Sequence, residues 1–265
     1  MASKNELTIL THALLSGMTL LIPIPFLDDW LKNQVQRRMV WLLVHSYGHK
    51  TSDQEISILI PEEDPGCLKG CLIGTTVYVI KKLIRQLNPI LEWSRAVDTI
   101  SQCYYHGYLL NHALQQGWYQ PGSLRRAAQI QAAIRQARKE INTNIINQAV
   151  RRTLVGSRQF VLQTARQIGQ DINRLIFRRI RAALVGIGLW LVGRKARKRI
   201  KLDPVEEKLE EIIEQAPDKQ RVEFTNLLTA LQSSINGEAQ QVLKDLELRM
   251  AQALAQSSSD QAPVA

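Results

Sequence analysis

The sequence predicts an all-α protein, built as a helical bundle with an N-terminal hydrophobic helical hairpin and a long cationic amphipathic helix. Apolar residues recur every three or four positions over most of the 265 residues, which is the spacing of one helix face. Proline and glycine stand where these patterns stop, and a strand-like pattern competes only at residues 75–80. Apolar residues make up 45% and charged residues 22%, so the chain can bury a substantial core.

The first two elements are predicted to form the hydrophobic hairpin. Pro23 and Pro25 separate them, and Gly48 can end the second. Asp28 and Asp29 fall in the first turn of the second helix, where negative charge is favourable. The apolar face of the first helix consists of Leu7, Leu10, Leu14, Met18 and Leu21, and that of the second of Leu27, Leu31, Val35, Met39, Leu42 and Leu43.

Two further segments complete the hydrophobic part of the chain. A polar loop that contains Pro61 is expected to follow the hairpin, and residues 70–84 form an apolar run after it. Asn88 and Pro89 have the character of an N-cap and a first helical residue, and Gly117 is a stop signal. A helix is therefore predicted from Pro89 to the residue before Gly117.

Charge divides the chain into three parts. Residues 120–201 hold fifteen Arg and four Lys against two acidic residues, whereas residues 1–119 hold ten basic and ten acidic residues. Residues 202–265 hold five basic and twelve acidic residues. We therefore predict a hydrophobic helical domain (1–119), an Arg-rich amphipathic helical region (120–201) and an acidic helical tail (202–265).

The Arg-rich region and the tail also have helical periodicity. A long amphipathic helix is predicted from residue 145 to residue 180, with a bend at Gly156 or Gly169. An acidic helix is expected to start at Asp203 and Pro204, and a final helix or pair of helices to follow it. The apolar positions of that last part are Phe224, Leu227, Leu228, Leu231, Val242, Leu246 and Met250.

Cations surround an uninterrupted apolar run at residues 182–193 (AALVGIGLWLVG), which indicates contact with an anionic surface that has an apolar layer beneath it. Anionic membrane lipid is therefore the favoured partner, and the expected location is the cytoplasmic side of a membrane, peripheral or partly inserted. An acidic protein or a second copy of the chain is a further candidate partner. The predicted membrane-binding residues are Arg178, Arg179, Arg181, Trp190, Leu191, Arg194, Lys195, Arg197, Lys198 and Arg199.

Nucleic acid is a competing partner, because arginine pairs well with phosphate. We consider it less favoured, because Phe160, Phe177 and Trp190 are the few aromatic residues of residues 120–201 on which bases could stack.

A zinc site is the sharpest chemical alternative. Cys67 and Cys71 are four residues apart, Cys103 and His106 are three apart, and a helix would place each pair on one face. The simpler interpretation is that the cysteines are buried apolar residues and that His106 is a satisfied helix residue. We therefore favour no metal site and no cofactor, and three cysteines imply no disulfide framework.

Other polar residues have structural explanations. His45 and His49 have the spacing of a zinc-hydrolase pair, but no glutamate lies beside His45, so both are interpreted as loop or cap residues. Tyr105, His106, Tyr108 and His112 indicate either a buried hydrogen-bonded network or a pocket within an apolar helix. Phosphate-binding loops and nucleophile elbows are missing from the sequence, so no enzymatic activity is predicted.

Residues 13–48 (ALLSGMTLLIPIPFLDDWLKNQVQRRMVWLLVHSYG) combine a small and apolar run, a corner at Ile22-Pro23-Ile24-Pro25 and a Tyr47-Gly48 ending. An Asp follows the corner, and Gln36 and Met39 lie in the next helix. This pattern resembles the hydrophobic domain of unknown function attached to some bacterial Era-like GTPases, and its relative in EcsC-type proteins. The resemblance implies a bacterial, helical, membrane-associated module with two hydrophobic helices. It transfers no catalytic residue, and no GTPase domain is present in the sequence.

The predicted function is that of a membrane-associated helical scaffold or adaptor without catalytic activity. The alternatives are a nucleic-acid-binding protein that uses the same basic block and a zinc-stabilised helical protein.

Overall fold

The computed structural model describes residues 3–22, 27–61, 89–170 and 218–259, and all regular secondary structure in these ranges is helical. The predicted all-α class is thereby confirmed. The helices are α1 (Lys4–Leu20), α2 (Leu27–Ser46), α3 (Asp53–Leu59), α5 (Pro89–Gln115), α6 (Leu124–Glu140), α7 (Asn144–Gly156), α10 (Asp218–Glu238) and α11 (Gln240–Ser259). Residues 158–170 are also helical.

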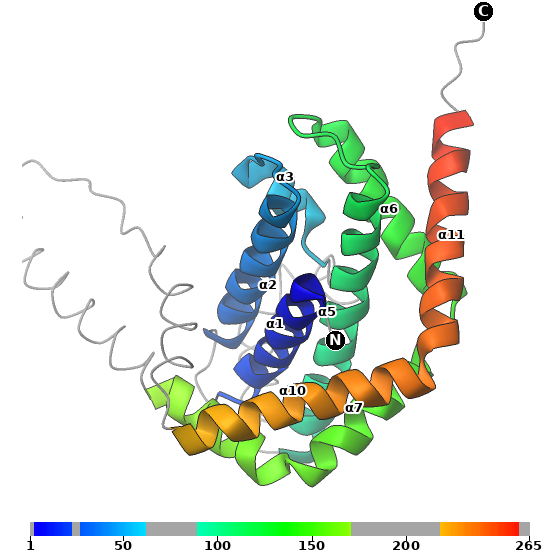
Figure 1. The fold of residues 1–265 in the computed structure, drawn as a ribbon. Coiled ribbons are helices and arrows are strands. Elements are labelled where there is room, and N and C mark those ends of the chain that lie inside the picture. Colours follow the sequence, from blue (N-terminus) through cyan, green and yellow to red (C-terminus); the bar gives the residue numbers. More distant parts are fainter. Residues whose placement is uncertain (1–2, 23–26, 62–88, 171–217, 260–265) are drawn as a thin grey trace, which may run out of the picture.

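Helix α1 packs against both α2 and α5, as Figure 1 shows. Gly17 permits a close approach, because a Cβ atom at this position would lie 2.3 Å from Cγ1 of Ile100 and 2.7 Å from the carbonyl oxygen of Ala96. The contact between α1 and α2 confirms the predicted packing of the first two helices. The corner at Pro23 and Pro25 lies outside the described residues.

Helix α5 occupies the centre of the fold and contacts α1, α2, α6, α7 and α11. It begins at Pro89 as predicted. Gly117 adopts a positive φ of 69° just after its end, a conformation that favours glycine. The N–H groups of Gly117 and Trp118 donate to the carbonyls of Leu114 and Ala113 and satisfy the last turn. Sequence signals thus located both ends of this helix to within one residue.

The Arg-rich region is divided into shorter helices in its described part. The predicted long helix starts at α7 and is interrupted at Ser157, directly after Gly156, before residues 158–170 continue as a helix. The break is one of the two positions at which a bend was predicted. Helix α6 precedes α7 as a separate element, and the rest of the predicted helix, beyond residue 170, lies outside the described residues.

The last two helices pack on the earlier ones. Helix α10 lies along α7, and α11 lies against α6 and α5 (Figure 1). One hydrophobic core includes residues from each of the three parts that charge distinguishes, such as Leu14, Ile130 and Leu246. The apolar run at residues 70–84 and the acidic helix predicted to start at Asp203 lie outside the described residues.

None of the helices in the described ranges is both long enough and apolar enough to cross a membrane.

Candidate anion-binding pocket

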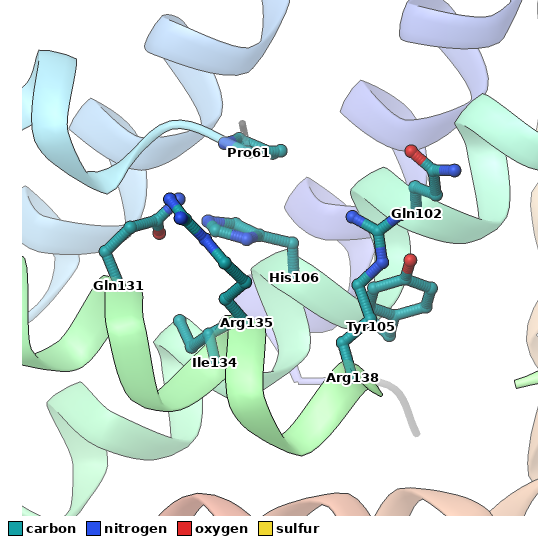
Figure 2. A pocket seen from close by; sticks show the side chains of 8 residues that line it. All are labelled: Pro61, Gln102, Tyr105, His106, Gln131, Ile134, Arg135 and Arg138. Carbon is teal, nitrogen blue, oxygen red and sulfur yellow. The ribbon is translucent and has the colours of Figure 1, made fainter. Parts of the chain in front are cut away.

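A small cavity lies between the end of α3, the middle of α5 and the face of α6 (Figure 2). Its volume is about 20 Å³, which admits one water-sized group. Both polar and cationic side chains surround it. The lining residues are Pro61, Gln102, Tyr105, His106, Gln131, Ile134, Arg135 and Arg138.

His106 lies on the α5 side of the cavity and is only 4% exposed. Its Nε2 atom donates to the carbonyl oxygen of Leu59 over 2.7 Å, because a carbonyl can only accept. Burial lowers the pKa of His106 to about 4, and the nearby charge of Arg138 acts in the same direction. The imidazole is therefore neutral at physiological pH, with its proton on Nε2 and an acceptor lone pair on Nδ1.

Gln131 contributes a second acceptor from α6. Its Nε2 donates to the carbonyl oxygen of Ile60 over 2.8 Å, which fixes the orientation of the amide. The Oε1 atom therefore points away from that carbonyl, and it is buried without a hydrogen-bond partner among the residues that the structure describes. The side chain is 5% exposed, so this unsatisfied acceptor is costly unless a donor occupies the cavity.

Arg135 and Arg138 supply the positive charge of the pocket. They follow Gln131 by four and seven residues, so the three side chains share one face of α6. Figure 2 shows Gln131 and Arg135 projecting toward the His106 ring, while Arg138 extends toward Gln102. The guanidinium of Arg138 also lies 5.8 Å from the centre of the Tyr105 ring. Among the lining residues that the structure describes, Arg135 and Arg138 are the charged ones at neutral pH, and none is a carboxylate.

Of the four candidate zinc ligands, Cys103 and His106 lie in the described part of the structure. Cys103 faces the interior, where the Ser16 hydroxyl donates to its Sγ over 3.6 Å and its thiol donates to Met39 Sδ over 3.7 Å. Burial raises the pKa of the thiol to about 12. Within the described residues, no group of three or more His, Cys, Asp and Glu side chains could hold a metal ion. Cys67 and Cys71 lie outside those residues.

The polar cluster of α5 separates into two parts. Tyr105 and His106 line the cavity, whereas Tyr108 and His112 face α11. There the Tyr108 hydroxyl donates to Glu247 over 2.6 Å, and His112 Nδ1 lies 3.3 Å from the same carboxylate oxygen. Burial, and then the hydrogen bond to Glu247, raise the pKa of Tyr108. Both interpretations of the cluster, a network and a pocket, therefore hold for different residues.

The interpretation of His45 and His49 as loop or cap residues holds for His49 only, because His45 lies within the last turn of α2. Gly48 has a φ of 76° and follows the end of α2, so His49 lies outside the helix and against the Tyr119 ring. His45 stacks on Trp41 with ring centres 4.0 Å apart. Asp29 lies in the first turn of α2, 4.0 Å from the ammonium of Lys32.

Glu55 forms a second buried polar site that sequence reasoning missed. It accepts hydrogen bonds from the backbone and hydroxyl of Ser52, from the Tyr119 hydroxyl and from the Gly122 backbone, at 2.8–3.0 Å. Burial alone would raise the pKa of Glu55, but these hydrogen bonds hold it below its usual value. The Ser-x-x-Glu spacing of a capping box was the available signal. Gln131, Arg135 and Pro61 carried no comparable signal, because only the fold brings them together.

All ten predicted membrane-binding residues, from Arg178 to Arg199, lie outside the described residues. Residues 120–170 include nine Arg and Lys residues and one acidic residue, Glu140. Several of their side chains are exposed on α6, α7 and residues 158–170, namely Arg125, Arg135, Lys139, Arg151, Arg152, Arg158 and Arg166.

Comparison with known protein families, curated proteins and solved structures gave no match, so the resemblance of residues 13–48 stays a prediction.

Proposed function

We propose that this protein is a helical scaffold or adaptor without catalytic activity that docks on anionic membrane lipid through its Arg-rich region. The observation that carries the proposal is the exposure of cations along α6, α7 and residues 158–170. Residues 120–170 contain nine basic residues and a single acidic residue. A surface of that composition attracts anions over about a Debye length.

The same region is amphipathic, which keeps its cations available at the surface. Ile146, Val150 and Leu154 of α7 are buried in the core, whereas Arg151 and Arg152 are exposed. Each cation contributes on the order of 1 kcal/mol near an anionic membrane surface. Several cations together, with the apolar run at residues 182–193 as an anchor, support stable but salt-sensitive docking.

In the described part of the structure, two ion pairs join this region to the C-terminal helices, and one of them involves a cation of the region. Arg152 contacts Glu238 over 2.9 Å, and Arg249 of α11 contacts Glu140 over 3.5 Å. Both pairs are substantially exposed, and exposed pairs contribute at most about 1 kcal/mol each. These two pairs therefore compete only weakly with a lipid surface.

Co-sedimentation with vesicles tests this proposal. The full-length protein should pellet with vesicles that contain anionic lipid but not with neutral ones, and raising the salt from about 0.1 M to about 1 M should release it. Changing Arg125, Arg151 and Arg166 to Gln should reduce binding several-fold. Changing three exposed lysines elsewhere, Lys50, Lys219 and Lys244, to Gln removes equal charge and should have a smaller effect. Equal binding to neutral and anionic vesicles would contradict the proposal.

A further inference from the structure

We propose that a groove between α10 and residues 153–163 is the contact surface of a homodimer, in which Arg158 of each copy pairs with Glu223 of the other. The groove is lined by both segments. The inference goes beyond the proposed function and is independent of lipid. It rests on the shape of the groove, on its apolar surface and on its two charges.

The groove lies where the helices of the Arg-rich region are interrupted. Helix α7 ends at Gly156, and the chain is helical again at residues 158–170. Nothing lies within 4 Å of a Cβ atom at Gly156, so this position faces open space. On the α10 side the lining residues are Glu223, Asn226, Leu227 and Ala230. Their spacing of three, four and seven residues places them on one helix face, which is the kind of surface on which another helix packs.

The groove offers space and apolar surface to part of another protein. Its volume is about 790 Å³. Leu227 is buried and Phe160 is half-buried along it, while Val155, which also lines it, is 60% exposed. Val222, which precedes Glu223 in α10, is 58% exposed. Exposed apolar side chains that gather at one groove, rather than lying scattered, are typical of a contact surface.

Two opposite charges line the groove, one from each side. Arg158 comes from the helix at residues 158–170, and Glu223 comes from α10. In the described part of the structure, Glu223 has neither a hydrogen bond nor an ion pair, and Arg158 has no carboxylate partner. The guanidinium of Arg158 lies 5.5 Å from the centre of the Trp93 ring, a contact that leaves its charge in place. An occupant of the groove that is electrostatically complementary therefore presents an anion to Arg158 and a cation to Glu223.

A second copy of the chain presents both charges. In a two-fold symmetric dimer the same surface lies on both sides of the interface, so the pair between Arg158 and the partner's Glu223 occurs twice. The exposed Val155 of each copy then enters the groove of the other, where Leu227 and Phe160 provide apolar surface. A lipid headgroup or a nucleic acid would supply the anion for Arg158 but would place phosphate beside Glu223.

Sedimentation velocity of the intact protein without lipid, at concentrations from about 1 to about 200 µM, tests the dimer. The parent should change from monomer to dimer over this range. Arg158→Glu and Glu223→Arg should each weaken the dimer at least about tenfold, because two-fold symmetry brings two like-charged pairs together in each variant. A parent that stays monomeric at every concentration would overturn the proposal and leave the groove to a different partner.

Two matched controls separate the groove from general surface effects. Arg166 is exposed on the same helix as Arg158 but outside the groove, so Arg166→Glu should leave dimerisation unchanged. Ala230→Arg places a long side chain in the groove and should weaken the dimer about tenfold, whereas Thr229→Arg adds the same side chain on a neighbouring face of α10 and should not. If either control weakened the dimer as much as its groove variant, the proposal would be refuted.

Mixing the two charge-reversal variants shows whether the ion pairs join different copies. Arg158→Glu has two acidic groups at its groove and Glu223→Arg has two basic ones, so an equimolar mixture should form a heterodimer about as tightly as the parent forms its homodimer. A contact within one chain cannot be restored in this way. Thermal unfolding confirms that both variants fold. A mixture that remains monomeric would overturn the proposal, and so would a parent dimer that neither variant weakens, because its interface would then lie elsewhere on the molecule.

Discussion

His106 of α5 donates a hydrogen bond over 2.7 Å to the carbonyl oxygen of Leu59, the last residue of α3. Gln131 of α6 donates a hydrogen bond over 2.8 Å to the carbonyl oxygen of Ile60, the next residue. The last carbonyls of a helix have no partner within the helix, and here two buried side chains supply one for each. The end of α3 is therefore fixed between α5 and α6, and this contact also forms one wall of the cavity.

The neutrality of His106 makes stability depend on pH. Its pKa is lowered from 6.5 to about 4 by burial, so between these values the unfolded chain binds more protons than the folded protein. The free energy of unfolding should therefore rise as the pH rises from about 4 to 6.5, by up to roughly 3 kcal/mol from this group. Urea unfolding at several pH values measures this change.

Substitution of His106 separates its contribution from those of other groups. His106→Gln should flatten the rise between these pH values and destabilise the protein at neutral pH. His45→Gln is the matched control, because His45 is exposed at the end of α2. An unchanged pH profile in His106→Gln would show that another group titrates in this range.

Glu55→Gln should destabilise the protein at neutral pH by about 1–3 kcal/mol, because the carboxylate accepts several hydrogen bonds in a buried site. Its lowered pKa means that this stabilisation is present above the usual pKa and is lost as the pH falls through the lower, folded-state value. Glu6 occupies the same position in the exposed capping box of α1, so Glu6→Gln is the control and should cost less. If Glu55→Gln and Glu6→Gln lowered the free energy of unfolding equally, both losses would come from the capping hydrogen bonds alone.

Gly17→Ala should destabilise the protein by about 1–3 kcal/mol or more, because the new methyl group would overlap Ile100 and the backbone oxygen of Ala96. Gly237→Ala provides the opposite case. Nothing lies within 4 Å of a Cβ atom at Gly237, and alanine should stabilise α10 by about 0.5–1 kcal/mol. Thermal unfolding of both variants measures the difference, and a stable Gly17→Ala protein would exclude the close packing of α1 on α5.

Local signals predicted much of the fold. Pro89 and Gly117 marked the ends of α5, and Gly48 marked the end of α2, because these residues restrict the backbone whatever the surrounding structure is. Helix α3 was expected to be a loop. It has only seven residues, too few for a clear periodicity, and it depends on its capping box and on contacts with α6.

The pocket could be predicted only in part. The polar residues around His106 indicated either a network or a cavity, and both exist. Arg135 and Arg138 had been assigned to a general cationic surface. Their position beside His106 follows from the packing of α6 on α3 and α5, which no local pattern encodes.

The purified protein should contain no stoichiometric zinc. Cys103 is a buried thiol whose pKa is raised to about 12, whereas zinc binds a thiolate, and His106 already donates to Leu59. Metal analysis by mass spectrometry measures the content. One equivalent of zinc that is lost in Cys103→Ser would show that the pair at residues 67 and 71 completes a site with α5.

The final prediction distinguishes membrane lipid from nucleic acid as the partner of the Arg-rich region. Changing Trp190 and Leu191 to Ser removes apolar residues and leaves every cation in place. Changing Arg194, Arg197 and Arg199 to Gln removes charge and leaves the apolar run intact. Both sets lie outside the described residues, so this prediction rests on the sequence.

The two partners respond differently because they use different forces. Phosphate binding by a nucleic acid depends on the number of cations and on salt, so only the Arg194, Arg197 and Arg199 variant should lose duplex DNA binding. An interfacial helix also buries apolar area, at about 25 cal/mol per Å², so the Trp190 and Leu191 variant should bind anionic vesicles several-fold more weakly. Both variants are therefore measured against vesicles and duplex DNA at two salt concentrations. If the Trp190 and Leu191 variant bound vesicles as well as the parent, and the parent preferred DNA at physiological salt, the cationic region would be a nucleic-acid site.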